Sequence, residues 1–303
     1  MTEQLPPDVI AQLRALDPAV TPELAQSSWA LLTPFHEKAG YTAPNIARDQ
    51  AYGDHPRQRL DVHTGDDDQG GRPVFVFVHG GGFVRGDKHI PGAPQYDLVG
   101  AWAVRRGYVG VTITYRLAPE YQWPSGAEDV AKAVQWLRQN IAGFGGDPDK
   151  IVVAGNSAGA VHVASFAAGQ GAGAGAGPAA IAGAALLSGI YEIGTPAAGS
   201  PEHVYYGPDP GPEVSSLPGL LEAPIPLLFS VAERDPLFFQ EAAGRVVSAW
   251  LSKHGTVPDL VWVEGHNHIS TIGSLTVDEA ALGTALARFV DRHTATEGTE
   301  GAA

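Results

Sequence analysis

Ser157 lies in a pentapeptide whose pattern could supply an activated nucleophile. The segment Gly155-Asn156-Ser157-Ala158-Gly159 follows the apolar run IVVA and precedes the apolar run AVHVASFAA. A G-x-S-x-G sequence between a buried strand and a helix is typical of a sharp turn that exposes a serine hydroxyl. The glycines are needed because such a turn crowds backbone against backbone. The motif alone is weak in a chain with 38 glycines, but its position between strand and helix predicts Ser157 as a nucleophile.

A second glycine-rich segment, His79-Gly80-Gly81-Gly82-Phe83, also follows an apolar run. Three successive glycines leave backbone N–H groups open to an approaching substrate oxygen. We therefore predict an oxyanion hole made by the amides of Gly81, Gly82 and Ala158. A phosphate-binding loop is the alternative for such a sequence, but neither G-x-x-x-x-G-K-[ST] nor G-x-G-x-x-G occurs here.

Asp235 is the predicted acid that orients the catalytic base. It follows the apolar run PLLFSVAE and precedes Pro236, so it is expected near the carboxyl edge of a sheet, where loops converge on the serine. An aspartate before a proline could instead cap a helix. Glu233 and Glu264 are the rival carboxylates.

His268 is the predicted general base, in a loop that also holds His266. The chain order Ser157, Asp235, His268 is the one expected when a G-x-S-x-G serine works with a histidine and an acid. The spacing of residues does not separate the two histidines. An H-x-H pair could also bind a metal ion, but no third and fourth ligands cluster nearby and cysteine is absent, so we expect no metal.

These residues must be positioned by strands that alternate with helices. The runs that read as strands buried on both faces are PVFVFVHG (73–80), YVGVTITY (108–115), KIVVAGNS (150–157), AIAGAALLSG (180–189), PLLFSVAE (226–233) and DLVWVEG (259–265). Residues 126–142 carry apolar side chains at helical spacing. Thr276 and Glu279 read as a capping box for a last helix. The alternation predicts an α/β fold with a mostly parallel sheet covered by helices on both faces.

The remaining segments suggest how the chain is divided. Residues 1–45 read as helices broken by prolines, with Thr21 as an N-cap, and residues 45–63 read as strands. Residues 46–294 are expected to form the α/β domain, and 295–303 a disordered tail. The Gly/Ala segment 169–178 is expected to be a flexible surface loop without a packing role.

Composition excludes several classes of protein. The chain of 303 residues has 19 Lys plus Arg against 33 Asp plus Glu, a formal net charge of −14, so neither nucleic acid nor an anionic membrane is an expected partner. There are no cysteines, which rules out disulfides and thiol nucleophiles. No signal peptide or 18-residue apolar run is visible, so we expect a cytoplasmic protein that needs no cofactor.

With these motifs in order, the chain from about Tyr52 to the last helix resembles the hormone-sensitive-lipase-like bacterial carboxylesterases and the related feruloyl esterases, acetylxylan esterases and arylformamidases, which have the α/β-hydrolase fold. The motifs that carry the resemblance are HGGGF (79–83), GDK (86–88), YRLAPE (115–120), GNSAG (155–159), ERDPL (233–237) and GHNHIS (265–270). The pattern G-x-x-H in that family selects His268 as base. Asn156 and the sequence HNHIS depart from the usual forms.

The resemblance implies roles for residues outside the triad. His79 would orient its loop by hydrogen bonding, and Arg116 and Glu120 would lock a loop without touching substrate. The N-terminal helices resemble a cap over the acyl site, which implies short to medium acyl chains. Homodimers are common in the family. Aromatic candidates for the pocket, each equally compatible with a core position, are Phe83, Trp123, Tyr205, Tyr206 and Phe238.

The expected chemistry is hydrolysis of a small-molecule ester through an acyl-enzyme. The main alternative is an arylformamidase-type amide hydrolase with the same three residues, because the choice between ester and amide depends on the pocket. A non-catalytic hydrolase-fold binding protein would usually have lost one of Ser157, Asp235 and His268. A peptidase would normally carry a larger lid, for which the chain has no extra segment.

Overall fold

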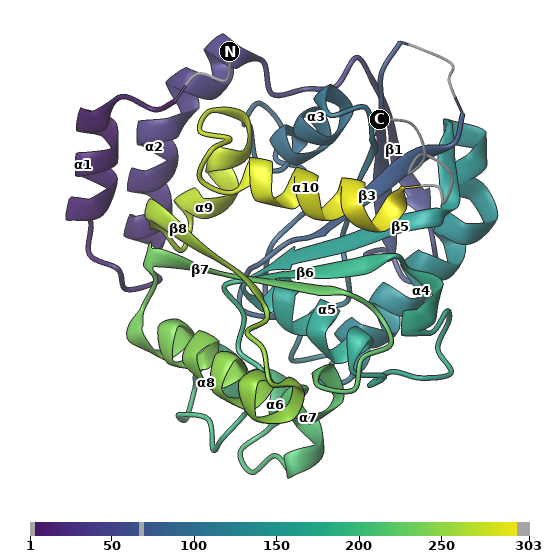
Figure 1. Cartoon of the computed structure of the whole chain (residues 1–303), viewed down its shortest axis with the longest axis vertical. Coiled ribbons are helices and arrows are strands. Elements are labelled where there is room, and N and C mark those ends of the chain that lie inside the picture. The colour runs from purple at the N-terminus through teal and green to yellow at the C-terminus, as the bar shows by residue number, and fades with distance from the viewer. Residues whose placement is uncertain (1–3, 67–69, 296–303) are drawn as a thin grey trace.

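A twisted eight-stranded sheet forms the centre of the computed structural model, which describes residues 4–66 and 70–295 (Figure 1). The strand order is β1-β2-β4-β3-β5-β6-β7-β8, and all pairs from β4 to β8 are parallel, whereas β2 is antiparallel to both of its neighbours. The strands are β1 (Asn45–Ala51), β2 (Arg59–Thr64), β3 (Arg72–Val78), β4 (Val109–Ile113), β5 (Gly146–Asn156), β6 (Gly183–Leu187), β7 (Leu227–Arg234) and β8 (Asp259–Asn267).

Helices cover both faces of the sheet, as the sequence predicted. Alternate residues of one strand enter two separate cores: Val76 packs with α4 and α5, whereas Phe77 packs with α3 and α10. The α-helices are α1 (Pro7–Ala15), α2 (Pro22–Ala39), α3 (Asp97–Arg105), α4 (Ser125–Asn140), α5 (Ala158–Ala167), α6 (Pro201–Tyr206), α7 (Leu217–Leu220), α8 (Leu237–His254), α9 (Ser270–Gly273) and α10 (Gly283–Thr294). The fold class expected from the sequence is therefore confirmed.

Strand β8 departs from the expected burial on both faces. Val261 and Val263 pack into the core with α10, but Leu260 and Trp262, on the other face, are 40% and 52% exposed. The reason is that β8 is an edge strand, and α8, the helix on that side, packs on β7. An apolar sequence was therefore not sufficient evidence for complete burial here.

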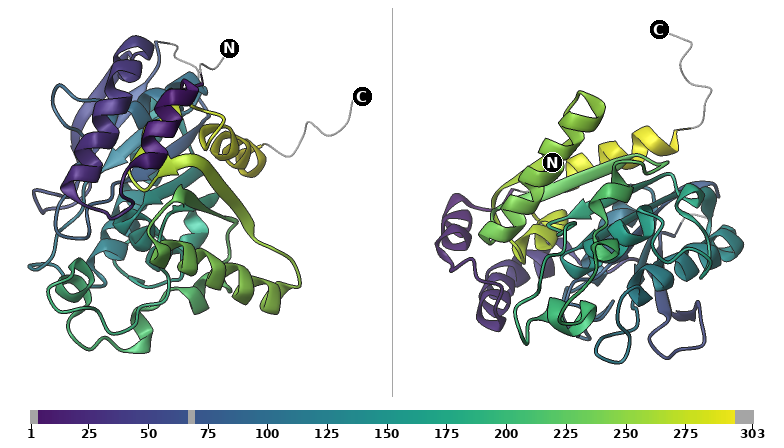
Figure 2. Two further views of the ribbon diagram at one scale, coloured as in Figure 1. Left: turned by 90° about the vertical axis from the view of Figure 1, so that its left-hand side faces the viewer. Right: turned by 90° about the horizontal axis from the view of Figure 1, so that it is seen from below.

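The two N-terminal helices pack beside the carboxyl end of β8 (Figure 2). Leu13 of α1 and Leu32 of α2 share a small apolar cluster with Val277. Thr21 caps α2 as predicted, because its Oγ1 accepts a hydrogen bond from the N–H of Leu24. The division of the chain at residue 45 and the role of residues 1–45 as a cap remain predictions. The predicted disordered tail lies, apart from Ala295, outside the described residues.

The predicted capping box for the last helix is wrong. Helix α10 begins only at Gly283, and Thr276 ends a short 3-10 turn in which its Oγ1 lies 2.8 Å from Nδ1 of His36. Glu279 pairs with Arg106. Both polar side chains therefore have long-range partners, which a local motif does not reveal.

The Gly/Ala segment 169–178 forms turns, but the expectation that it has no packing role is wrong. A Cβ at Gly171 would lie 3.0 Å from the backbone N of Glu128, and one at Gly175 would lie 2.5 Å from the carbonyl oxygen of Ala131. The N–H of Ala176 donates to that same carbonyl. The absence of side chains is what allows the segment to lie against α4.

Candidate active site

Ser157 occupies the turn between β5 and α5. Its backbone has φ 57° and ψ −125°, a conformation that costs a non-glycine residue about 1–3 kcal/mol. The close packing that the motif predicted is present: a Cβ at Gly159 would lie 2.1 Å from the carbonyl oxygen of Val78, and one at Gly155 would lie 2.4 Å from the carbonyl carbon of Gly159. The strained serine is thus held at the carboxyl edge of the sheet.

His268 and Asp235 form a buried hydrogen-bonded pair. Nδ1 of His268 lies 2.7 Å from Oδ1 of Asp235, so Nδ1 carries the proton that the carboxylate accepts. The ring of Phe239 stacks on the imidazole at 4.2 Å between centroids. Nε2 of His268 is buried and has no hydrogen-bond partner among the described residues. An imidazole held in this way presents an unprotonated Nε2, as a general base requires.

The end of β6 connects the serine turn to this pair. The N–H of Ser157 donates to the carbonyl of Leu187 at 2.9 Å, and the next residue, Ser188, donates its hydroxyl to Oδ2 of Asp235 at 2.6 Å. The N–H of Ala232 donates to the same oxygen at 2.7 Å. Ser157 and Asp235 are therefore hydrogen-bonded to two consecutive residues, Leu187 and Ser188, at the end of β6.

The rival carboxylates and the rival histidine have other partners. Glu233 accepts hydrogen bonds from Arg14, which lower the pKa of its carboxyl group, and from the N–H of Gly265. Glu264 pairs with Arg14 and is 79% exposed.

His266 has partners other than Asp235 at both ring nitrogens. Its Nδ1 lies 3.1 Å from the Ser270 hydroxyl, and its Nε2 lies 3.4 Å from Oδ2 of Asp278. In the part of the chain that the structure describes, no three His, Asp or Glu side chains form a cluster that could hold a metal ion.

The glycine loop lies directly against the serine. A Cβ at Gly80 would lie 3.1 Å from the Cβ of Ser157. Gly81 and Gly82 have positive φ values of 133° and 58°. Neither their N–H groups nor that of Ala158 donate to a backbone carbonyl among the described residues. Unpaired donors beside a nucleophile are what an oxyanion hole needs.

The five aromatic residues considered for a substrate pocket fall into two groups. Phe83 and Tyr205 stack at 4.5 Å between ring centroids. Both are buried in one apolar cluster with Ala158, so they pack between the glycine loop and the start of α5 as part of the core. Trp123 and Tyr206 pack at the edge of the same cluster. Phe238 differs: it is 46% exposed and lies 4.1 Å from Phe239, which itself stacks on His268. Of the five, Phe238 is the one whose side chain is exposed.

Ser188 is a site residue that sequence reasoning missed. It is buried, has φ 49°, and binds the second oxygen of Asp235. Its position at the end of the apolar run 180–189 was the one available signal, because the ends of parallel strands meet at the same edge of the sheet.

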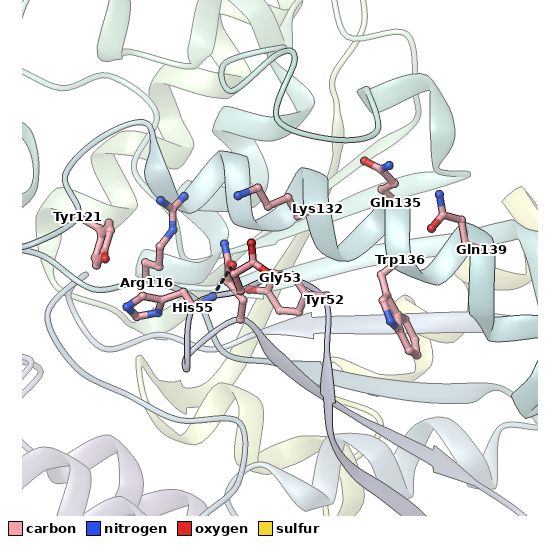
Figure 3. Close-up of a pocket in the computed structure, with 11 residues that line it drawn as sticks. Tyr52, Gly53, His55, Arg116, Tyr121, Lys132, Gln135, Trp136 and Gln139 are labelled. Carbon is pink, nitrogen blue, oxygen red and sulfur yellow. Dashed lines mark hydrogen bonds between the residues drawn. The ribbon is translucent and has the colours of Figure 1, made fainter.

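A separate groove of about 450 Å³ lies between the 52–58 loop and α4 (Figure 3). Its lining residues are Tyr52, Gly53, Asp54, His55, Gln58, Arg116, Tyr121, Lys132, Gln135, Trp136 and Gln139. None of them belongs to the Ser157 turn, the glycine loop or the His268–Asp235 pair, so the groove is distinct from the candidate active site.

Arg116, which lines this groove, locks its loop by pairing with Asp129 and Glu128. The expectation that Glu120 takes part is not met, because Glu120 is exposed and forms no ion pair with another described residue.

No helix in the described ranges is long and apolar enough to cross a membrane.

The sheet order, the strand–Ser157–helix turn and the His268–Asp235 pair at the same edge define an α/β-hydrolase fold. Solved structures agree. A Pyrobaculum calidifontis esterase has a TM-score of 0.68 at 23% identity and covers 96% of this chain and 100% of its own. EstE1, a carboxylesterase from a metagenomic library, has a TM-score of 0.66 at 22% identity and covers 93% and 100%.

Sequence comparisons show that part of the chain is similar to esterases. The BD-FAE family model matches residues 60–174, which include the HGGG and GNSAG motifs. Esterase LipC of Mycobacterium tuberculosis is 42% identical over 117 residues, and Carboxylesterase NlhH of the same organism is 46% identical over 89 residues. These matches span 38% and 29% of this chain but only 28% and 26% of the relatives. The resemblance expected from the motifs is therefore confirmed.

Proposed function

We propose that the protein is a serine carboxylester hydrolase with Ser157 as nucleophile, His268 as base and Asp235 as the orienting acid. The observation that carries the proposal is the buried His268–Asp235 pair, whose unpaired Nε2 lies at the sheet edge that also holds Ser157. The names of LipC and NlhH, an esterase and a carboxylesterase, support ester hydrolysis.

In the first half of the proposed reaction, Nε2 of His268 takes the proton of the Ser157 hydroxyl as its oxygen attacks the ester carbonyl. Asp235 stabilises the resulting imidazolium and keeps its Nδ1–H in place. The oxyanion is bound by the amides of Gly81, Gly82 and Ala158, where each donor of such a hole contributes about 10²–10³ in turnover. The imidazolium then protonates the leaving alcohol, and the acyl group stays on Ser157.

In the second half, His268 takes a proton from the water that attacks the acyl-enzyme and gives it to the Ser157 oxygen as the acyl–oxygen bond breaks and the carboxylic acid leaves. No step needs a cofactor. The exposed apolar side chains of Leu237 and Phe238, next to the Asp235 turn, favour an apolar acyl or alcohol group. By analogy with the family cap, we propose short to medium acyl chains as substrates.

The decisive assay is hydrolysis of p-nitrophenyl esters from acetate to decanoate by wild type and by Ser157→Ala, with N-formylkynurenine in parallel. The proposal requires ester turnover that peaks at short chains and disappears in the variant. Turnover confined to the formamide would replace it by an arylformamidase that uses the same residues. Ester turnover that survives in Ser157→Ala would refute the mechanism.

A further inference from the structure

Arg57, in the loop between β1 and β2, contacts His79, which begins the glycine loop, and Gly86, which follows that loop. Its Nε donates to the carbonyl of Tyr115 at 2.8 Å, and one terminal nitrogen donates to the carbonyl of Gly86 at 2.8 Å. The same nitrogen lies 3.5 Å from Nε2 of His79. One guanidinium thus contacts three segments: His79 at the start of the glycine loop, Gly86 after that loop, and Tyr115 after β4.

His79 in turn forms a hydrogen bond to Gly80, whose peptide group precedes the predicted oxyanion donor, the N–H of Gly81. Its Nδ1 lies 2.6 Å from the carbonyl oxygen of Gly80, so Nδ1 must carry a proton and donate it. The peptide between Gly80 and Gly81 is trans, and in a trans peptide the C=O and the following N–H point in opposite directions. A hydrogen bond that holds the Gly80 carbonyl on the His79 side therefore directs the Gly81 N–H away from His79.

The tautomer of His79 depends on what lies at its other nitrogen. A neutral imidazole that donates from Nδ1 has an unprotonated Nε2, which can only accept. The guanidinium of Arg57 has donors and no acceptor, and it always carries its charge, so it favours this tautomer and disfavours the Nε2–H form. Burial lowers the pKa of His79 to about 4, with a further contribution from the charge of Arg57, so the ring is neutral at neutral pH.

We propose that Arg57 is a positioning residue for the oxyanion hole: it selects the Nδ1–H tautomer of His79, and that tautomer aims the Gly81 amide at the oxyanion. The inference rests on the proposed function and adds a residue outside the three that carry the chemistry. The same contacts explain why position 86 is a glycine, because a Cβ at Gly86 would lie 2.4 Å from both the Gly80 oxygen and Nδ1 of His79.

The test compares Arg57→Met, which keeps an apolar stem but removes every donor, with Arg138→Met. Arg138 is a matched control, because its guanidinium also donates to two backbone carbonyls, those of Pro148 and Ala180, near the amino ends of β5 and β6 and so at the edge of the sheet opposite the glycine loop. We expect Arg57→Met to lower kcat by about 10- to 100-fold, as small misplacements of catalytic groups do, with KM unchanged. Arg138→Met should leave kcat at the wild-type value.

Two further readouts separate positioning from a merely structural role. Affinity for a short trifluoromethyl ketone, which forms a tetrahedral adduct on the serine, should fall in Arg57→Met by the same factor as kcat. Long-range ¹H–¹⁵N NMR spectra of ¹⁵N-histidine-labelled protein should show His79 protonated at Nδ1 in wild type and a shift toward the Nε2–H form in Arg57→Met.

The outcomes distinguish the two proposals. An unchanged His79 tautomer in folded Arg57→Met, or wild-type kcat in that variant, would overturn the role of Arg57 while ester turnover by wild type still stood. Equal losses in Arg57→Met and Arg138→Met would also overturn it. Absence of ester turnover in wild type would refute the proposed function, and the NMR tautomer would still test the link between Arg57 and His79.

Discussion

Asp235 is bound by Ser188 on the side that does not face His268. The Ser188 hydroxyl donates to Oδ2 at 2.6 Å, whereas Oδ1 of the same carboxylate lies 2.7 Å from Nδ1 of His268. Because both carboxylate oxygens are engaged, the plane of the carboxylate is held and the direction in which it meets the imidazole is set. Ser188 thereby contributes to the orientation of His268 without contacting it.

Replacement of Ser188 by glycine should therefore reduce turnover. Glycine tolerates φ 49° without strain, so Ser188→Gly removes the hydroxyl and little else. We expect kcat for p-nitrophenyl acetate to fall by about tenfold, because a hydrogen bond to a charged group contributes roughly 1.5 kcal/mol or more. Ser230→Ala is the control, since the buried Ser230 hydroxyl has no hydrogen-bond partner among the described residues. Equal kcat values in the two variants would show that the Ser188 hydroxyl does not help to orient His268.

The assignment of the acid predicts a sharp difference between two neighbouring carboxylates. Asp235→Asn should lower kcat by about 10⁴, as loss of the charge and tautomer control of such an acid does. Glu233→Gln should keep kcat within a few-fold, because Glu233 is bound to Arg14, but it should cost about 1 kcal/mol or less of stability as that partly exposed pair is lost. Steady-state kinetics with thermal unfolding measures both, and a larger kcat loss in Glu233→Gln would reverse the assignment.

The Gly/Ala segment gives a matched pair of stability variants. In Gly175→Ala the new methyl group would overlap the Ala131 carbonyl, so we expect a loss of about 1–3 kcal/mol. A Cβ at Gly177 meets no atom within 4 Å, so Gly177→Ala should change stability by less than about 0.5 kcal/mol. Thermal unfolding separates the two, and equal melting temperatures would show that the segment does not rest on α4.

Stability should fall as the pH is lowered, partly because of His162. This side chain is buried among Phe83, Tyr115 and Tyr205, and burial lowers its pKa from 6.5 to about 3. Between these two pH values the His162 side chain is therefore neutral in the folded protein but protonated in the unfolded chain. The stability it contributes is fully present above pH 6.5 and is lost progressively as the pH falls toward 3.

His162→Asn tests this because an amide cannot titrate. Urea unfolding at several pH values should give a slope of unfolding free energy against pH that is smaller in the variant, by a difference that approaches one proton, or ~1.4 kcal/mol per pH unit, at about pH 5. Identical slopes in wild type and His162→Asn would contradict the prediction.

Sequence by itself determined the features that depend on short stretches of chain. Ser157 was found because a strand, a tight glycine turn and a helix follow one another within residues 151–168, and steric crowding in that turn is local. The strand ends that carry Asp235 and His268 were found in the same way, since buried parallel strands are continuous apolar runs. The sheet and its helical layers followed from their alternation.

Tertiary structure decided which side chains pair. Arg14 and Glu233 are 219 residues apart in the chain, and their ion pair removes a rival acid that sequence could not exclude. The same holds for Ser188 with Asp235 and Arg57 with His79. Glu279 binds Arg106 instead of capping a helix, and β8 leaves Trp262 exposed because it ends the sheet. Hydrogen bonds, ion pairs and burial depend on what the fold brings near, and that is a property of the packed chain and not of any one segment.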